Sequence, residues 1–375
     1  MSRRRFIFIE PSKVGSQHIT LIEGYLRALI ASAVLSRTFD LIFCAADSTA
    51  AALSAGTRAA IKHVSIPVMD PEKRRLIRKT CVESYVVIRY LLRMRRGDVL
   101  FVSCVLPTTL LFLEACNWLL RRRGFFVELH GEIEGLFDKS MQRPSSFGFW
   151  VLQWMRLRRR GSTLSLVVID DFIKARLLAE FPGKLQESEI FVVHIPMLPW
   201  PAASALARPE PVPSACFIGY RTRLKGFDQF VQLSSLVPGV DFVAIGGGKV
   251  EHVTSSRSAP IGGSEGYMHA IAQCSVALFP YVAGYNCSLS AAAVDALSAG
   301  VYMLASDRAC FVSLEQYFGA EILTICRSTA DMAALLTDAR WLEEKRGAQE
   351  RRLERLKVSK YSLDAVRSSF EALMA

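Results

Sequence analysis

The sequence predicts an α/β protein with two doubly wound domains, and three features of its 375 residues lead to this prediction. Short apolar runs alternate with helical patterns along most of the chain, which is typical of parallel sheets covered on both faces. A proline-rich stretch divides this alternation into two halves. The composition is 51% hydrophobic and 10% aromatic, so each half can form a core of its own.

The first half contains seven apolar runs of strand length. Helical patterns such as HITLIEGYLRALIASAVLS and DDFIKARLLAEF lie between them. The predicted strands cover residues 5–10, 40–45, 62–68, 99–104, 125–130, 164–169 and 190–196. The longest apolar stretch, residues 98–120, contains Pro107 and Glu114, so we expect a strand and a helix there rather than a membrane span.

Residues 196–214 contain six prolines and predict a linker between two domains. The alternation then resumes, with strands predicted at 214–220, 241–247, 276–281, 301–306 and 321–326. We therefore expect Rossmann-like domains at 1–200 and 214–355, joined by a linker at 201–213. Residues 356–375 form an amphipathic pattern, which predicts a C-terminal helix that can cross back to the first domain.

Ligands bind at the carboxyl ends of the strands in doubly wound sheets, so the loops after the strands are the candidate sites. After strand 214–220, Arg221, Arg223 and Lys225 precede a helix, and such cations can hold a diphosphate. Gly247 lies in a run of three glycines that allows a ligand to approach the backbone closely. Residues 285–300 predict a helix whose N-terminus, near Asn286–Ser290, can receive an anion.

The order of these segments resembles the C-terminal domain of the retaining, family-four GT-B glycosyltransferases. A basic loop with Lys-Gly is followed by a glycine-rich strand end, by Pro-Tyr-x-x-Gly-Tyr with Asp-Ala-Leu-Ser-Ala-Gly, and by Ser-Asp. The resemblance covers residues 214–310 well and the first half only in outline. It implies two Rossmann-like domains facing a central cleft, and a nucleotide-sugar donor bound mainly by the second domain.

The resemblance also implies roles for individual residues. Lys225 matches the phosphate-binding lysine, and Arg221 or Arg223 would replace the family's arginine, because Tyr220 stands at that position. Asp295 matches the second Glu of a paired-Glu motif, which contacts the ribose. The first Glu falls on Cys287, and a thiol cannot accept hydrogen bonds from sugar hydroxyls as a carboxylate does. The remaining donor-binding candidates are Gly15, Gly247, Asn286, Ser288 and Leu289.

In the first half, VELHGEIEG (127–135) is the strongest candidate segment. The family often has a histidine near the donor sugar at this position, so the resemblance implies that His130 and Glu132 act in catalysis. Asp170 and Asp171 either cap a helix or supply a base for an inverting reaction. His18 is either a polar residue at a helix start or part of the site.

All of the net charge of +11 lies in residues 1–200, which contain 29 Lys and Arg and 18 Asp and Glu. Such asymmetry indicates a polyanionic partner for this half. SFGFWVLQWMRLRRR (146–160) combines an aromatic helical face with a basic end, so we expect Trp150, Trp154 and Arg158 to contact an anionic membrane or the acceptor. A core helix with a solvated end is the alternative. We expect no nucleic-acid partner, because the sequence contains no nucleic-acid-binding motif.

The nine cysteines are widely spaced and include no C-x-x-C pair, which predicts free thiols in a reducing compartment. No metal motif is present, and we expect no cofactor other than the nucleotide-sugar substrate. The N-terminal apolar run is too short for a signal peptide, so the expected location is the cytoplasm, at the inner face of the membrane.

The predicted function is transfer of a sugar from a nucleotide-sugar donor to an acceptor hydroxyl, on a lipid-linked saccharide in surface polysaccharide assembly. Three alternatives stay open. The first is an inverting enzyme whose base is Asp170, Asp171 or Glu132. The second is a non-catalytic nucleotide-sugar-binding protein, and the third is a nucleic-acid-binding protein.

Overall fold

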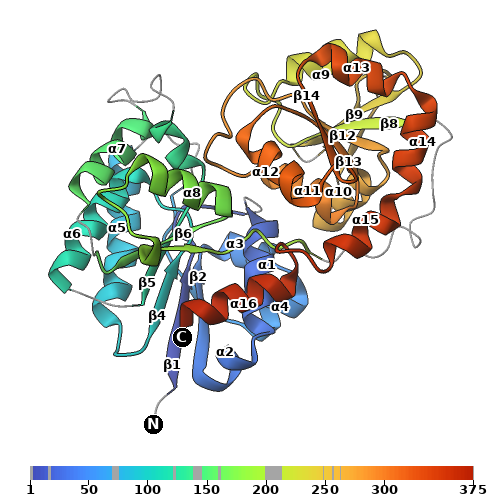
Figure 1. The fold of residues 1–375 in the computed structure, drawn as a ribbon. Helices are drawn as coiled ribbons and strands as arrows, with labels where there is room; N and C mark the ends of the chain where they lie inside the picture. The colour runs from blue at the N-terminus through green and yellow to red at the C-terminus, as the bar shows by residue number, and fades with distance from the viewer. Residues whose placement is uncertain are drawn as a thin grey trace. The chain divides into compact units, whose positions relative to one another are not determined.

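A computed structural model describes residues 3–15, 18–69, 76–120, 124–137, 146–158, 162–198, 213–247, 249–255, 257–261 and 263–374. The chain divides into two compact units. Unit 1 comprises Met1–Pro196 and Leu363–Ala375, and unit 2 comprises Met197–Ser362 (Figure 1). Each unit contains a seven-stranded sheet, so the predicted pair of α/β domains is confirmed. Of the linker predicted at 201–213, all but Pro213 lies outside the described residues.

The sheet of unit 1 has the strand order β3-β2-β1-β4-β5-β6-β7, and all of its pairs are parallel. Its strands are β1 (Arg4–Ile9), β2 (Phe39–Ala45), β3 (Lys62–Ser65), β4 (Val99–Val102), β5 (Phe125–Leu129), β6 (Leu164–Val168) and β7 (Ile190–Val192). All seven correspond to predicted strands. The signal is clearest for β1, β4, β5 and β6, which are buried along nearly their whole length and therefore need a continuous apolar sequence.

The helices of unit 1 follow the strands in the order that the alternation predicts. They are α1 (Ile19–Ile30), α2 (Ala33–Thr38), α3 (Asp47–Ala52), α4 (Ala55–Ala60), α5 (Leu76–Arg93), α6 (Pro107–Leu120), α7 (Phe147–Leu157) and α8 (Asp171–Glu180), with the 3-10 turns η1 (Gly131–Leu136) and η3 (Glu187–Glu189). The long apolar stretch 98–120 divides into β4 and α6, as predicted.

The last helix, α16 (Leu363–Met374), packs on α1 within unit 1. Its Phe370 lies in an aromatic cluster, with ring centroids 5.2 Å from Tyr25 and 5.4 Å from Phe101. Ser32, at the N-cap of α2, donates a 2.7 Å hydrogen bond to Glu371. The C-terminal residues therefore complete the core of the N-terminal unit.

The sheet of unit 2 has the order β11-β10-β9-β8-β12-β13-β14. Its strands are β8 (Ser214–Ile218), β9 (Asp241–Gly246), β10 (Lys249–His252), β11 (Ser258–Pro260), β12 (Val276–Phe279), β13 (Tyr302–Ser306) and β14 (Leu323–Cys326). The two strands that the sequence did not predict, β10 and β11, are antiparallel and short. They contain mostly exposed or half-buried residues, so they give no apolar signal.

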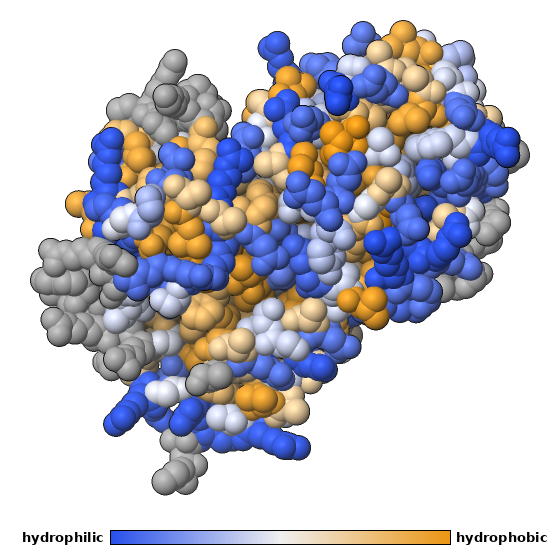
Figure 2. Space-filling view, viewed as in Figure 1, coloured by the Kyte–Doolittle hydropathy of each residue, from blue (hydrophilic) through white to orange (hydrophobic). Residues whose placement is uncertain are grey.

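The helices of unit 2 are α9 (Phe227–Leu236), α10 (Gly263–Ala272), α11 (Ala291–Ser298), α12 (Ala309–Phe318), α13 (Thr329–Leu336), α14 (Ala339–Gly347) and α15 (Gln349–Leu356). Phe217, Phe230 and Phe242 form the centre of a buried core between β8, β9 and α9. Within the described residues, no helix combines the length and apolar character needed to cross a membrane. All nine cysteines lie within the described residues, and none of them forms a disulfide bond. On the face shown in Figure 2, hydrophobic residues reach the surface among hydrophilic ones.

Candidate functional site

The strand order of unit 2 reverses between β8 and β12, and the predicted donor residues of this unit follow β8, β9 and β12 along the chain. β8 ends at Ile218, and the next residue, Gly219, has a φ of +101°. The end of β9 packs closely against it, because a Cβ atom on Gly246 would lie 2.5 Å from the Gly219 carbonyl oxygen. The close contact fixes the backbone at the carboxyl end of these two strands.

The loop that carries Lys225 is attached to the segment after β12. Val282 donates a 3.0 Å backbone hydrogen bond to the Leu224 carbonyl. Gly226 has a φ of +71°, and a Cβ atom there would lie 1.8 Å from the Pro280 carbonyl oxygen. The glycine that follows Lys225 is thus required by the packing, because only glycine allows the two loops to meet.

Lys225 and Asp295 lie near enough at this position for each charge to act on the pKa of the other. The Lys225 ammonium lies 5.7 Å from the centroid of the Tyr281 ring, and burial lowers its pKa while the charge of Asp295 acts in the opposite direction. Asp295 lies on α11 and accepts a 3.0 Å hydrogen bond from the Tyr267 hydroxyl on α10. Burial raises the pKa of Asp295 to about 7, although the Tyr267 hydrogen bond and the Lys225 charge oppose this shift. The pair offers one cation and one hydrogen-bond acceptor to a ligand.

The two arginines of the predicted clamp have other surroundings than Lys225. Arg221 forms a 2.7 Å ion pair with Glu251 on β10, and its guanidinium lies 5.4 Å from the centroid of the Phe227 ring. Lys249 contacts the same carboxylate at 2.8 Å, and the hydrogen bonds from Lys249 and Arg221 lower the pKa of Glu251 to about 2. Arg223 is exposed to solvent. Of the three predicted cations, Lys225 is the one that the structure brings to Asp295.

The helix predicted to start near Asn286–Ser290 begins at Ala291, so Asn286, Ser288 and Leu289 belong to the preceding loop. The reason is local: Tyr285 has a φ of +61°, which a helix does not allow, and Ser290 is the N-cap, whose Oγ accepts a hydrogen bond from the Ala293 N–H. Ser288 and Leu289 are buried, and Cys287 is completely buried. Gly247 lies at the end of β9 with a φ of +63° and open space around it.

In unit 1 the strand order reverses between β1 and β4, and charged residues gather after these strands and β5. The buried Glu10 accepts hydrogen bonds from the Ser12 and Lys13 backbone N–H groups, each at 3.0 Å, and from Ser103 at 2.7 Å. These bonds shape the loop that contains Gly15, which has a φ of +60°. The charges of Cys104, Glu10 and Glu132 raise the pKa of Lys13, although burial opposes this.

His130 follows β5 and contacts a carboxylate on each side. Its Nε2 lies 3.2 Å from the Glu128 Oε1, and its backbone N–H donates a 2.7 Å hydrogen bond to Glu132. Glu128 is completely buried and accepts a 2.7 Å hydrogen bond from the Tyr25 hydroxyl. Burial opposes a charged imidazole, but the combined effect of Glu128 and Glu132 raises the pKa of His130. The ring of His18 lies 5.5 Å from that of His130, and burial places the pKa of His18 well below its ordinary value.

The structure gives Asp170 a capping role. Its side chain accepts a 3.2 Å hydrogen bond from the Phe172 N–H as the N-cap of α8. Asp171 has an exposed side chain that lies 3.1 Å from His194. Both positions agree with the helix-start interpretation of this sequence.

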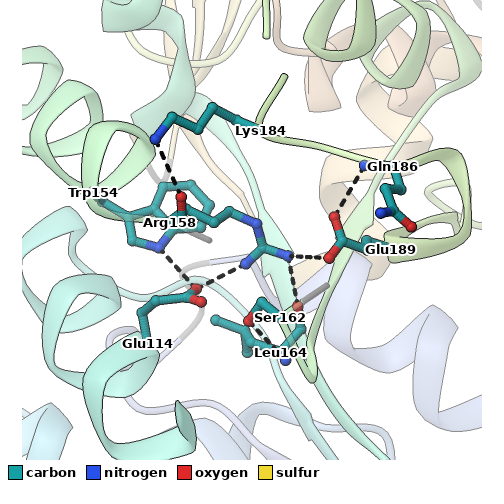
Figure 3. A network of polar contacts seen from close by, with 8 residues as sticks. All are labelled: Glu114, Trp154, Arg158, Ser162, Leu164, Lys184, Gln186 and Glu189. Carbon is teal, nitrogen blue, oxygen red and sulfur yellow. Dashed lines mark hydrogen bonds and ion pairs between the residues drawn. The ribbon is translucent and has the colours of Figure 1, made fainter. Parts of the chain in front are cut away.

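The helix predicted to face a membrane is part of the interior of unit 1. Trp154 and Arg158 are each 1% exposed, which differs from the expected membrane-facing surface, while Trp150 is half-buried. Arg158 forms a 2.8 Å ion pair with Glu114 and a 2.9 Å hydrogen bond to the Leu164 carbonyl (Figure 3). The Trp154 indole donates to the same Glu114 at 3.3 Å. An apolar helical face with a basic end suits the interior of a protein as well as a membrane surface. In this structure, the face of α7 packs against α6 and η1.

Four residues whose contacts organise these candidate sites are absent from the sequence predictions: Tyr25, Glu128, Glu251 and Tyr267. Glu128 carries the one signal that was available, because it is a carboxylate inside the apolar strand FFVEL. A charged group in a buried strand is rare unless it is paired. The other three give no signal, since their partners are distant in sequence.

Solved structures resemble the chain over its whole length. Sucrose-phosphate synthase from Thermosynechococcus elongatus matches with a TM-score of 0.65 at 14% identity, covering 99% of this chain and 98% of that one. Anabaena HepE in complex with UDP and glucose matches with a TM-score of 0.63 at 9% identity, covering 98% and 99%. WaaG, a glycosyltransferase involved in lipopolysaccharide biosynthesis, matches with a TM-score of 0.60 at 12% identity, covering 97% and 98%.

No protein-family model and no curated protein matches the sequence. The structural matches show the fold: the chain has the GT-B fold of glycosyltransferases, as the order of its motifs predicted.

Proposed function

We propose that the protein is a glycosyltransferase that moves a sugar from a nucleotide-sugar donor to an acceptor hydroxyl. The observation that carries the proposal is the position of Lys225 and Asp295, which lie within electrostatic range of each other after β8 and β12, at the strand-order reversal of unit 2 in a chain with the GT-B fold. HepE, which shares this fold, was also solved with UDP-glucose bound, which is the donor chemistry we propose.

Lys225 suits the donor diphosphate. Burial destabilises its ammonium in the free protein, so an anion that comes close gains a strong interaction at a small reorganisation cost. Asp295 suits the ribose, because a carboxylate accepts hydrogen bonds from two neighbouring hydroxyls. Tyr267 holds Asp295 in place. We assign Arg221, once it leaves Glu251, and Arg223 as further diphosphate contacts, with Gly247, Asn286, Ser288 and Leu289 lining the donor.

We further propose that unit 1 binds the acceptor, a saccharide carried on a lipid in surface polysaccharide assembly, with His130 and Glu132 at the reacting groups and Gly15 in the loop beside them. WaaG shares the fold, and so does WaaB, which is described as a lipopolysaccharide outer core galactosyltransferase. Both similarities support this setting. The ion pair with Glu128 keeps His130 available as a cation or proton donor.

Thermal unfolding with UDP-, GDP- and ADP-sugars tests the donor assignment, because a ligand that binds the native state raises its stability. One of these donors is expected to raise the Tm, and Lys225→Ala is expected to abolish the rise. The control is Lys357→Ala, because Lys357 is an exposed lysine of unit 2 paired with Glu354. If no donor raises the Tm, or if Lys225→Ala behaves like the control, the donor site is not at Lys225.

A non-catalytic nucleotide-sugar-binding protein is the second candidate. The observation that favours it is Cys287, a completely buried thiol where the resemblance places a carboxylate. Binding of a donor without transfer to water or any saccharide acceptor would support this candidate. The configuration of the product at the anomeric carbon, read by NMR, decides between the retaining and inverting reactions.

A further inference from the structure

Helix α5 of unit 1 exposes a band of apolar side chains. Ile77 is 82% exposed, Tyr85 61% and Leu92 56%, and Cys81 is also exposed. These positions are four, four and seven residues apart, so they lie on one face of the helix. The opposite face packs in the interior through Val86, Val87 and Leu91, among others.

Arginines border this band on one side. Arg78, Arg89 and Arg93 are exposed, and each lies within about one turn of an apolar member of the band. In the part of the chain that the structure describes, none of the three forms an ion pair with a carboxylate. Below we call these three arginines, with Ile77, Cys81, Tyr85 and Leu92, the α5 face.

The α5 face carries no negative charge. The one carboxylate of α5, Glu83, is buried, where it accepts hydrogen bonds from the Leu106 N–H at 2.9 Å and from Thr109 at 2.8 Å. Burial raises the pKa of Glu83 to about 7, which lowers its negative charge further. Two more exposed arginines, Arg95 and Arg96, follow the helix directly. This face accounts for part of the net charge of +11 in residues 1–200.

We propose that the α5 face docks on an anionic lipid surface. An apolar band beside a row of arginines, on a helix about 27 Å long, is suited to lie in the plane of a membrane interface. Ile77, Tyr85 and Leu92 enter the boundary between headgroups and acyl chains, and the arginines reach the lipid phosphates. Charge complementarity selects this occupant over a second copy of the chain, because two such basic faces repel each other.

Docking through α5 complements the proposed function. α5 begins after β3, so its Ile77 end is at the carboxyl edge of the sheet, the edge at which His130 and Glu10 also lie. A lipid-linked acceptor would therefore be presented at the edge that carries these groups. This purpose rests on the proposed function, but the docking itself does not, because lipid binding is measured without a donor.

The test is co-sedimentation of the full chain with vesicles of phosphatidylcholine alone and of phosphatidylcholine with an equal amount of phosphatidylglycerol. We expect binding to the anionic vesicles only, weakened by high salt. Arg89→Gln with Arg93→Gln should weaken it roughly 30-fold, and Tyr85→Ser with Leu92→Ser at least about 10-fold. The control pair is Leu236→Ser with Val358→Ser, which are 53% and 86% exposed residues of unit 2. Thermal unfolding confirms that each variant is folded.

Three outcomes overturn the proposal: no binding of the wild-type chain to anionic vesicles, equal binding to both kinds of vesicle, or an equal loss in the control pair. Binding to duplex DNA in place of vesicles assigns the face to nucleic acid and also overturns it. Donor-induced stabilisation is measured on the same variants. If a donor raises the Tm while vesicle binding fails, the docking surface is wrong and the proposed function stands. If the vesicles bind as expected while no donor raises the Tm, the proposed function is wrong and the docking surface stands.

Discussion

The hydroxyl of Tyr267 donates a 3.0 Å hydrogen bond to the Oδ2 of Asp295, which links α10 to α11 next to Lys225. The two residues are 28 positions apart, and the bond places a mostly buried carboxyl group at the carboxyl end of the unit 2 sheet. The contact holds the proposed ribose-binding group in one orientation.

Asp295 makes the stability of the protein depend on pH. Its pKa is raised from 3.8 to about 7, so between these values the folded state binds more protons than the unfolded state. The contribution of Asp295 to the free energy of unfolding is therefore fully present near pH 4 and is lost as the pH rises through 7, by up to about 1.4 kcal/mol per pH unit. Asp295→Asn keeps an oxygen for Tyr267 and removes this dependence.

Urea denaturation at pH 5 and pH 8 measures the effect. The stability of Asp295→Asn relative to the wild type is expected to increase from pH 5 to pH 8. Asp307→Asn, at an exposed position, is the control, and its difference should stay small. A difference for Asp295→Asn that is the same at both pH values would contradict the raised pKa.

Gly226 is predicted to tolerate no side chain. In Gly226→Ala the Cβ atom would lie 1.8 Å from the Pro280 carbonyl oxygen, so the loop that carries Lys225 must separate from the segment after β12. We expect a loss of about 3 kcal/mol or more in the free energy of unfolding, together with loss of donor binding. Gly239→Ala is the control, because Gly239 also has a positive φ, of +99°, but has open space around it. Its cost should be about 1 kcal/mol, and equal costs in the two variants would show that the contact with Pro280 is unimportant.

The sequence predicted the strands well where burial is complete. Runs such as VLFVSC and FFVELH have to be apolar on both faces, so their pattern is visible without any partner. The β10–β11 hairpin was not predicted, because its residues are mostly exposed and pair antiparallel at the end of the sheet. Its Glu251 nevertheless determines where Arg221 lies.

The order of the motifs predicted Lys225 and Asp295 as donor-binding candidates, but it could not show their environment. Burial, which shifts both pKa values, depends on the packing of α10 and β12 around them. The aromatic and basic pattern of residues 146–160 was ambiguous for a physical reason. A helix face with tryptophans and an arginine at its end is suited to a membrane interface and to a protein interior alike. The residue that decides between them is Glu114, the partner of Arg158, and it lies 44 residues earlier in the sequence.

Arg158 is predicted to stabilise unit 1. Arg158→Met removes the cation that pairs with Glu114, although the Trp154 indole still donates to this carboxylate, and it removes the guanidinium that donates to the Leu164 carbonyl. Removing one partner of a buried ion pair costs about 3–5 kcal/mol. The control is Arg156→Met, two residues earlier on α7, where the side chain is exposed and a change within about 0.5 kcal/mol is expected. Urea denaturation of both variants measures the difference. Equal stability of the two variants would mean that the network in Figure 3 contributes little.

Glu128 is predicted to control the protonation of His130. Because the pKa of His130 is raised above 6.5, the ion pair stabilises the fold below that pH, and this contribution is lost as the pH rises through the raised pKa. Glu128→Gln keeps the shape of the side chain but removes its charge, so the imidazole of His130 should titrate at a lower pH. NMR titration of the histidine ring protons, assigned by His130→Gln, follows the midpoint directly. The control is Glu180→Gln on the exposed end of α8, which should leave the midpoint where it is. A midpoint that Glu128→Gln does not lower would show that the 3.2 Å contact carries no charge interaction, and the assignment of His130 as a cation at the acceptor side would have to be withdrawn.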